Sequence, residues 1–306
     1  MPAPAPSPAA IAADIARRLL GPGALVSRFQ AENSSVFRID FAPGTPPHVV
    51  KIAGQTPESI TREQQVIQYL GPLGFEVPVL EFTQADYPEL NLPFTVMPLT
   101  RGTSAAAIYA QDSRRGAAVV ERLGRFLGRI SNLAPSSVPG VLTASQARER
   151  ELAAWETHNR TLTESSRGRP EFVRYYRNVR DLLEAPPTWF GNRDGCHLIT
   201  NGSDTFTVID WGESGLIWPY ADLARCIHNL RAVSDLRGGQ WLECLLRGFG
   251  AERPLEDGWI ETVETWLLYF CIREGLLFGR TQRELAGHRL LKLAQQTSNR
   301  RWMEGT

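Results

Sequence analysis

The sequence predicts an α+β protein in which a small mixed β-sheet with one helix, residues 1–98, precedes a larger and mostly helical part, residues 99–306. Two patterns support this class: short apolar stretches typical of strands dominate the first hundred residues, and apolar residues repeat every three or four positions from Gly116 onward. With 306 residues, 42% of them apolar, the chain is long enough to bury a sizeable core.

Strand patterns follow one another in the first part. Residues 24–30 and 35–41 predict a hairpin around the polar turn 31–34, and residues 48–53 form a third, largely apolar run. A fourth strand begins at Phe94 and runs into a turn near Gly102. Because Pro98 has no N–H, Met97 and Leu99 are the residues there whose main-chain groups can bind a ligand.

Residues 56–70 predict a helix, with Thr56 as the N-cap and Pro57 at the first helical position. Ile60, Glu63 and Ile67 fall on one face, so Glu63 lies among apolar residues and needs a cation. Only two of the 33 basic residues are lysines, and one of them, Lys51, interrupts the third strand. We therefore predict an ion pair between Lys51 and Glu63.

The second part is predicted to be helical after Gly116. A long amphipathic helix contains residues 119–130, and further helices are expected at residues 148–161, 170–184, 223–233, 240–249, 259–278 and 282–296.

The residues that most clearly indicate a chemical function lie in the stretch Trp189–Ala224. It reads WFGNRDGCHLITNGSDTFTVIDWGESGLIWPYADLA, and its apolar run VID delivers Asp210 to a glycine-containing turn, where a carboxylate can hold a divalent cation. This stretch resembles the aminoglycoside phosphotransferase family, whose loop reads approximately His-Gly-Asp-x-x-x-x-Asn with a metal-binding Asp thirteen residues further on. The resemblance implies a bilobal protein-kinase-like fold that uses ATP or GTP with Mg²⁺ or Mn²⁺.

Aligned on that motif, Phe190 takes the His position, Asn192 that of the catalytic Asp, and His197 that of the Asn, while Asp210 is the second metal ligand. The spacing is kept but the catalytic base is missing, since an amide cannot accept the proton. Asp194 stays open as a surrogate base, although aligning it on the motif shortens the distance to Asp210.

The resemblance also implies roles outside the loop. Lys51, oriented by Glu63, would contact the nucleotide phosphates, and Ser34 and Ser35 would donate to them from a turn that has no glycine. Met97 and Leu99 would pair with the base, and Asp222 would brace the catalytic loop through backbone amides. Residues that would line an acceptor pocket are Glu213, Glu264, Trp266 and Tyr269, although the spacing of the last two is also typical of a core.

His197 has two interpretations. It can bind a transition metal with Asp210, because imidazole suits Mn²⁺ or Zn²⁺ better than Mg²⁺, or it can hydrogen-bond within the loop. A Cys196–His197 nucleophilic pair is disfavoured because adjacent side chains usually diverge.

Composition excludes several classes of function. The formal net charge is zero, and no basic stripe with interleaved aromatic residues suggests a nucleic-acid partner. The four cysteines form no CxxC pair, and no run of 18 apolar residues occurs, so we expect a cytoplasmic protein that does not span a membrane. The expected partner is a small polar metabolite, and the sequence leaves the oligomeric state open.

Two functions therefore remain. The first is ATP- and metal-dependent transfer to a hydroxyl or amine of a small metabolite, with slowed or redirected chemistry because of Asn192. The second is a pseudokinase that binds a nucleotide or small ligand for a regulatory, scaffolding or non-kinase role.

Overall fold

A computed structural model describes residues 6–23, 25–29, 35–41, 44–53, 57–100, 102–104, 107–108, 111–161, 170–193, 198–200, 206–233 and 240–277. The chain divides into two compact units. The first comprises Met1–Thr103, Val138–Gly140 and Leu198–Ser214, and the second comprises Ser104–Ser137, Val141–His197 and Gly215–Thr306. Segments beyond residue 103 therefore complete the first unit.

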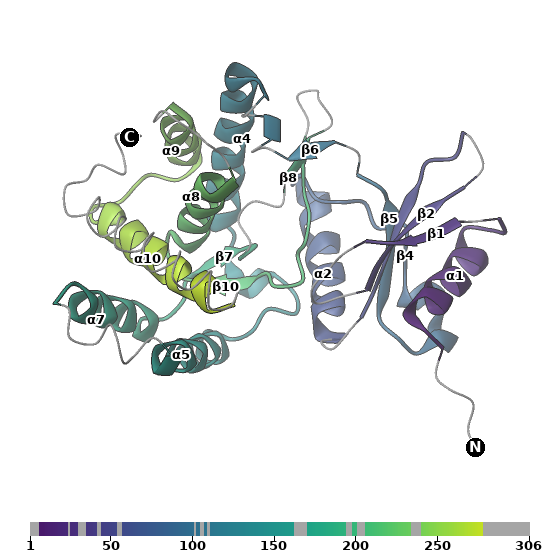
Figure 1. Ribbon diagram of the computed structural model, residues 1–306, viewed down its shortest axis with the longest axis horizontal. Coiled ribbons are helices and arrows are strands. Elements are labelled where there is room, and N and C mark those ends of the chain that lie inside the picture. The colour runs from purple at the N-terminus through teal and green to yellow at the C-terminus, as the bar shows by residue number, and fades with distance from the viewer. Residues whose placement is uncertain are drawn as a thin grey trace. The chain divides into compact units, whose positions relative to one another are not determined.

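A five-stranded sheet organises the first unit (Figure 1). Its strands, in the spatial order β1-β2-β3-β5-β4, are β1 Leu25–Arg28, β2 Ser35–Asp40, β3 His48–Ile52, β5 Phe94–Pro98 and β4 Phe82–Thr83. All four pairings are antiparallel, whereas the sequence led us to expect a mixed sheet. Short connections account for the antiparallel β1–β2 and β2–β3 pairs, because parallel neighbours need a long crossover.

Two helices cover opposite faces of this sheet (Figure 1). Helix α1, Pro8–Leu19, packs through Ala12, Ile15 and Ala16 on a core that includes Val50 and Ile52 of β3. Side chains alternate along a strand, so Lys51 points to the other face. Helix α2, Pro57–Leu70, lies on that second face, where its Glu63 contacts Lys51.

Helix α1 was not predicted from the sequence. The alanine- and proline-rich start of the chain does not look like a core helix, yet Ser7 caps it by accepting the N–H of Ala10 at 3.2 Å. Pro8 occupies a first-turn position where its missing N–H costs nothing. The cap, the proline and the spacing of Ala12, Ile15 and Ala16 were the available signals.

The remaining parts of the first unit are short. Strand β8, Leu198–Thr200, pairs antiparallel with β9, Phe206–Val208, in a sheet that also includes β6, Thr103–Ser104. The N–H of Val208 donates to the carbonyl of Glu76 at 2.7 Å, which attaches β9 to the chain that follows α2. Single 3-10 turns lie at Gly71–Leu73, Gln84–Asp86 and Pro88–Leu90.

The described part of the second unit is mostly helical and contains a two-stranded sheet, in which β7, Trp189–Gly191, pairs antiparallel with β10, Gly215–Ile217. Its helices are α4 Ser113–Ser131, α5 Ala144–Thr161, α7 Pro170–Glu184, α8 Ala221–Val233, α9 Gln240–Glu252 and α10 Trp259–Leu277, with a 3-10 turn at Pro135–Ser137. Every helix predicted up to residue 277 is present, and the one predicted at 282–296 lies outside the described residues.

Glycines allow α4 and α9 to approach closely. A Cβ atom on Gly124 would lie 2.1 Å from the carbonyl oxygen of Leu245, and one on Gly248 would lie 1.9 Å from that of Glu121. Neither backbone can yield without separating the helices. These glycines are therefore required by packing, despite their low helix propensity.

Replacing Gly124 with alanine is expected to destabilise the protein by about 1 to 3 kcal/mol, the usual cost of overpacking. Gly250 is the matched control, because it lies in the same helix pair with open space around its Cβ position. Gly250→Ala should stabilise by about 0.5 kcal/mol through helix propensity. Urea denaturation of both variants tests this, and equal effects would contradict the packing argument.

No helix in the described ranges is both long and apolar enough to cross a membrane.

Candidate functional site

Three charged side chains meet in the first unit. The Nζ atom of Lys51 lies 2.8 Å from Oε2 of Glu63 and 2.9 Å from Oδ1 of Asp210. The side chains of Lys51 and Glu63 are 12% and 3% exposed, while that of Asp210 is 43% exposed. One ammonium group therefore holds a buried and a solvent-accessible carboxylate, and the ion pair predicted between Lys51 and Glu63 is present.

Different local rules bring the three residues together. Strand alternation turns Lys51 away from its buried neighbours Val50 and Ile52, and helical periodicity turns Glu63 inward. Asp210 has φ = +65°, a left-handed conformation that aspartate tolerates better than most residues. The chain thus turns sharply just after β9, at the residue whose carboxylate contacts Lys51.

The electrostatics follow from burial. Desolvation by itself would lower the pKa of Lys51, but the carboxylates of Glu63 and Asp210 outweigh it and raise that pKa above its ordinary value. Burial also raises the pKa of Glu63, and the ammonium of Lys51 opposes this rise. Lys51 therefore stays cationic at neutral pH.

The turn after Asp210 is fastened to α2. The N–H of Trp211 donates to Oε1 of Glu63 at 3.3 Å, and Arg62 donates from Nη1 to the carbonyl of Gly212 at 3.1 Å. A Cβ atom on Gly212 would lie only 2.6 Å from Oγ of Ser59. Glycine lets the turn make this approach without displacing the Ser59 hydroxyl, and α2 positions both the carboxylate of Glu63 and the turn that holds Asp210.

The end of β5 was predicted to bind a nucleotide base, but its N–H groups are already hydrogen-bonded. The N–H of Leu99 donates to the carbonyl of Pro47 at 2.8 Å. Met97 pairs with Val49 two residues earlier, and hydrogen-bonded pairs recur every second residue in an antiparallel ladder. The N–H groups of Met97 and Leu99 are thus both used within the sheet.

The main-chain carbonyl of Pro98 is oriented differently from those of Met97 and Leu99. Pro98 lies opposite His48 in the ladder, between the hydrogen-bonded pairs, so its carbonyl faces away from β3. The alternation of main-chain groups along a strand was the signal that could have singled it out.

The altered loop belongs to the second unit. Asn192 follows β7 directly and is 1% exposed, and Phe190 is fully buried in β7. The carboxylate of Asp222, in the first turn of α8, accepts the N–H of Asn192 at 2.7 Å and that of Arg193 at 2.9 Å. Its two oxygens thus hold two consecutive backbone amides, as the predicted loop brace requires.

Gly191 makes this arrangement sterically possible. A Cβ atom there would lie 2.4 Å from Oδ2 of Asp222 and 2.3 Å from Cδ1 of Ile217. The second position of the loop motif is therefore a glycine because the carboxylate and β10 occupy the space that a side chain would need.

Replacing Asp222 with alanine is expected to destabilise the protein by about 3 kcal/mol, because two amides lose a charged acceptor. Hydrogen exchange at Asn192 and Arg193 should accelerate at the same time. The control is Asp181→Ala on the exposed surface of α7, which should change stability by less than about 0.5 kcal/mol. An unchanged exchange rate at both amides would contradict the brace.

A buried network continues from this loop. Arg193, with φ = +68°, donates from Nη2 to Oε2 of Glu151 in α5 at 3.0 Å. The hydroxyl of Tyr269 in α10 donates to the other carboxylate oxygen of Glu151. Sequence reasoning did not find this network, because its members lie 42 and 118 positions apart and share no local pattern.

The predicted acceptor-pocket residues separate into two groups. Trp266 and Tyr269 are 2% and 1% exposed in the core of the second unit, where Trp266 donates to the carbonyl of Pro219 at 3.2 Å. Both side chains therefore pack in the core, which is the alternative that their spacing also indicated. Glu264 is half-buried in α10, and Glu213 is half-buried in the first unit.

Other predicted positions lie outside the described residues, namely Ser34, Asp194 and His197. Ser35 is described and begins β2 opposite Ile52. Among the described residues, no three His, Cys, Asp or Glu side chains form a metal-binding group. The half-exposed carboxylate of Asp210 nevertheless fits Mg²⁺, which is often held by one or two carboxylates together with substrate phosphates.

Comparison with known proteins identifies the family. The profile of the phosphotransferase enzyme family matches residues 26–259, and the chain belongs to this family. No curated protein matches it in sequence.

Solved structures share the fold at low sequence identity. A thermostable mutant of aminoglycoside phosphotransferase APH(4)-Ia, in a ternary complex with ADP and hygromycin B, is 13% identical, with a TM-score of 0.65 over 92% of this chain and 97% of that one. The GDP complex of aminoglycoside 2′-phosphotransferase-IIIa is 15% identical, with a TM-score of 0.62 over 94% and 97%. A microcompartment-associated aminopropanol kinase is 16% identical, with a TM-score of 0.61 over 96% and 99%. The predicted α+β kinase-like fold class is confirmed.

Proposed function

We propose that this protein binds a nucleoside triphosphate with a divalent cation and transfers the terminal phosphoryl group to a hydroxyl or amine of a small polar metabolite. The observation that carries the proposal is the cluster of Lys51, Glu63 and Asp210, with nitrogen–oxygen distances of 2.8 and 2.9 Å. Membership of the phosphotransferase enzyme family supports the same reaction class. Slow or redirected chemistry is part of the proposal, because Asn192 replaces the expected base.

Each residue of the cluster has a distinct task. Lys51 contacts the phosphates, and Glu63 fixes the direction of the ammonium from its buried position on α2. Asp210 keeps a half-exposed carboxylate beside Lys51 and is the residue that would hold the cation. When bound, Mg²⁺ or Mn²⁺ would neutralise phosphate charge and orient the phosphoryl group for transfer.

The nucleotide base is assigned to the end of β5, at residues 97–99. Since the N–H groups of Met97 and Leu99 are used within the sheet, the carbonyl of Pro98, which faces away from β3, is the better acceptor for a base amino group. Structurally similar proteins contain ADP or GDP, so both ATP and GTP remain donors to test. Ser34 and Ser35 are proposed to contact the phosphates from the β1–β2 turn.

The acceptor oxygen or nitrogen attacks the terminal phosphorus while the bond to the departing diphosphate breaks. Asn192 can accept a hydrogen bond from the acceptor and orient it, but its amide cannot take the proton, which then passes to solvent or to Asp194. A loose transition state makes modest demands on a base, so transfer slows without stopping. The brace from Asp222 keeps Asn192 in place.

A second function is favoured by one observation. Both the His and the Asp positions of the loop motif carry residues that cannot exchange a proton, namely Phe190 and Asn192, and both are buried. This combination suits a pseudokinase that binds a nucleotide or small ligand in a regulatory, scaffolding or non-kinase role.

The decisive experiment measures binding and turnover separately. Titration calorimetry with ATP and GTP, each with Mg²⁺ or Mn²⁺, is followed by an assay of nucleoside diphosphate release with a panel of amino sugars and amino alcohols. Release that depends on the acceptor supports the transferase, and binding without release supports the pseudokinase. Absence of binding under all four conditions would overturn the transferase and any pseudokinase role that depends on a nucleotide.

A further inference from the structure

An ion pair within the second unit adjoins the loop that contains Asn192. Nη2 of Arg193 lies 3.0 Å from Oε2 of Glu151 in α5, and the two side chains are only 17% and 9% exposed. The hydroxyl of Tyr269 in α10 donates to Oε1 of the same carboxylate. None of these three residues belongs to the cluster that is proposed to bind the nucleotide, so their arrangement needs a separate explanation.

The backbone of Arg193 has an unusual conformation. Its φ is +68°, in the left-handed region that residues with a Cβ atom rarely adopt. Such a residue persists only where its surroundings hold it in place. Because Arg193 follows Asn192 directly, this turn sets the direction in which the chain leaves Asn192.

Two carboxylates hold Arg193 at different points. Oδ1 of Asp222 accepts its main-chain N–H at 2.9 Å, and Oε2 of Glu151 accepts from its guanidinium. The first contact fixes the peptide bond that joins Asn192 to Arg193. The second fixes the end of the side chain. Rotation about φ would break the second contact, because it moves the side chain while the peptide bond stays in place.

Glu151 is itself held by the core of the second unit. It lies one turn after Ala147 and one turn before Trp155, both of which are buried on the inward face of α5. The ring of Tyr269 lies 5.8 Å from that of Trp155 and 5.4 Å from that of Trp266, between centroids. The hydroxyl that contacts Glu151 is therefore carried by a packed ring, and the carboxylate offers its other oxygen to the guanidinium in one place.

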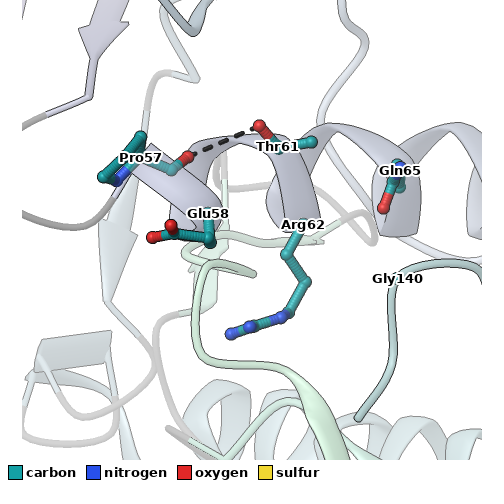
Figure 2. Close-up of a pocket in the computed structure, with 6 residues that line it drawn as sticks. All are labelled: Pro57, Glu58, Thr61, Arg62, Gln65 and Gly140. Atoms are coloured by element: carbon teal, nitrogen blue, oxygen red, sulfur yellow. Dashed lines mark hydrogen bonds between the residues drawn. The ribbon is translucent and has the colours of Figure 1, made fainter.

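A guanidinium also holds the turn in the first unit. Figure 2 shows Arg62 extending from α2, and its Nη1 donates to the carbonyl of Gly212 at 3.1 Å. The turn that it fastens contains Asp210, which has φ = +65°. A contact between an arginine and a neighbouring element therefore accompanies a left-handed residue at both turns of the proposed site.

We propose that Glu151 and Tyr269 are positioning residues, which act through Arg193 to hold the left-handed turn that directs the side chain of Asn192. Arg193 is a positioning residue as well, since its guanidinium is bound to Glu151. The kinetic consequences rest on the proposed transfer reaction. The placement of Asn192 can be measured without turnover, so failure of the reaction and failure of the positioning role are distinguishable.

Nuclear magnetic resonance tests the placement directly. The side-chain amide of Asn192 gives a pair of nitrogen–proton signals, which are identified by their absence in Asn192→Asp. Both signals should shift or broaden in Glu151→Gln, because an amide has one acceptor oxygen for two donors and turns its NH₂ group toward the other. Unchanged signals in the folded Glu151→Gln protein would overturn the proposal.

Glu184→Gln is the matched control. Glu184 forms an ion pair with Arg180 at 2.8 Å in α7, but both side chains are exposed. The control therefore removes the same charge from the same kind of pair, in the same unit, without touching the loop. Its Asn192 signals should match those of the native protein, and an equal change in both variants would show that the network has no specific effect.

Glycine and alanine at position 193 separate the turn from the charge. Both substitutions remove the guanidinium and leave Glu151 without it, but only glycine adopts a positive φ without strain. Arg193→Gly should therefore keep the Asn192 signals closer to their native positions than Arg193→Ala does. Equal displacement, or a larger one with glycine, would contradict the role of the left-handed turn.

Kinetics test the catalytic consequence. Glu151→Gln should lower kcat by about 10- to 100-fold, the usual effect of misplacing a group by about 1 Å, and Tyr269→Phe should lower it less because one contact to Glu151 remains. Nucleotide affinity should stay native in both, since the network lies outside the cluster around Lys51. Native kcat in Glu151→Gln, or an equal loss of nucleotide affinity, would overturn the positioning role. If the native protein shows no turnover, the transfer reaction fails, and the comparison of Asn192 signals still decides the placement.

Discussion

Replacing Lys51 with methionine is expected to abolish nucleotide binding and to destabilise the protein by about 3 to 5 kcal/mol. The stability loss arises because Glu63, only 3% exposed, loses the ammonium 2.8 Å away and must either carry an unpaired buried charge or take up a proton. Nucleotide binding is lost for a separate reason, since methionine offers no charge to the phosphates. Urea denaturation and calorimetry with ATP or GTP measure the two effects.

A double variant separates those effects. Adding Glu63→Leu to Lys51→Met replaces a buried ion pair with apolar side chains, which is often neutral for stability. Most of the lost stability should return, apart from about 1 kcal/mol for the hydrogen bond from the N–H of Trp211. Nucleotide binding should stay absent. A stable Lys51→Met protein that binds ATP as the native protein does would refute both the buried pair and the phosphate role.

Replacing Asn192 with aspartate is expected to raise the rate of phosphoryl transfer by about 10² to 10⁴, the usual contribution of a general base. The two side chains have nearly the same shape, and Asp222 holds the N–H of residue 192 at 2.7 Å, so the loop should keep its position. Because this position is buried, desolvation should raise the pKa of the new carboxyl, and the gain should increase with pH.

Two controls make the result interpretable. Asn192→Ala should not raise the rate, since alanine supplies no base. Asp194→Asn tests the surrogate: if Asp194 takes the proton in the native protein, this variant loses the residual turnover. A rate that is unaffected by Asn192→Asp would show that residue 192 does not contact the acceptor. The readout is initial rates of diphosphate release between pH 6 and pH 9.

Local patterns were sufficient for most elements. Helix α7 begins and ends at Pro170 and Glu184 as the periodicity predicts, and the hairpin of β1 and β2 follows from its polar turn. Strand order was harder, because pairing joins segments that are distant in the chain. Strand β4 is only two residues long. It pairs with β5 at the edge of the sheet, although it precedes β5 in the chain and could have been expected beside β3.

The site was predictable where one residue conflicted with its surroundings. Glu63 on an apolar helix face requires a cation, and a rare lysine in an apolar strand requires an anion, so the pair followed from sequence. Arg193 and Glu151 show no such conflict, since each is an ordinary charged residue on its own. Their partnership exists only because the fold brings the two side chains together.

The sequence by itself determined the identities that limit the chemistry: an ammonium at 51, carboxylates at 63 and 210, and an amide at 192. These follow from side-chain type, which no fold can change. The tertiary structure decided which atoms remain available to a ligand. The N–H of Leu99 is hydrogen-bonded within the sheet, Trp266 and Tyr269 are buried, and Gly140 lies against α2. Sequence alone could not give these facts, because hydrogen bonding and close packing depend on segments that meet only after folding.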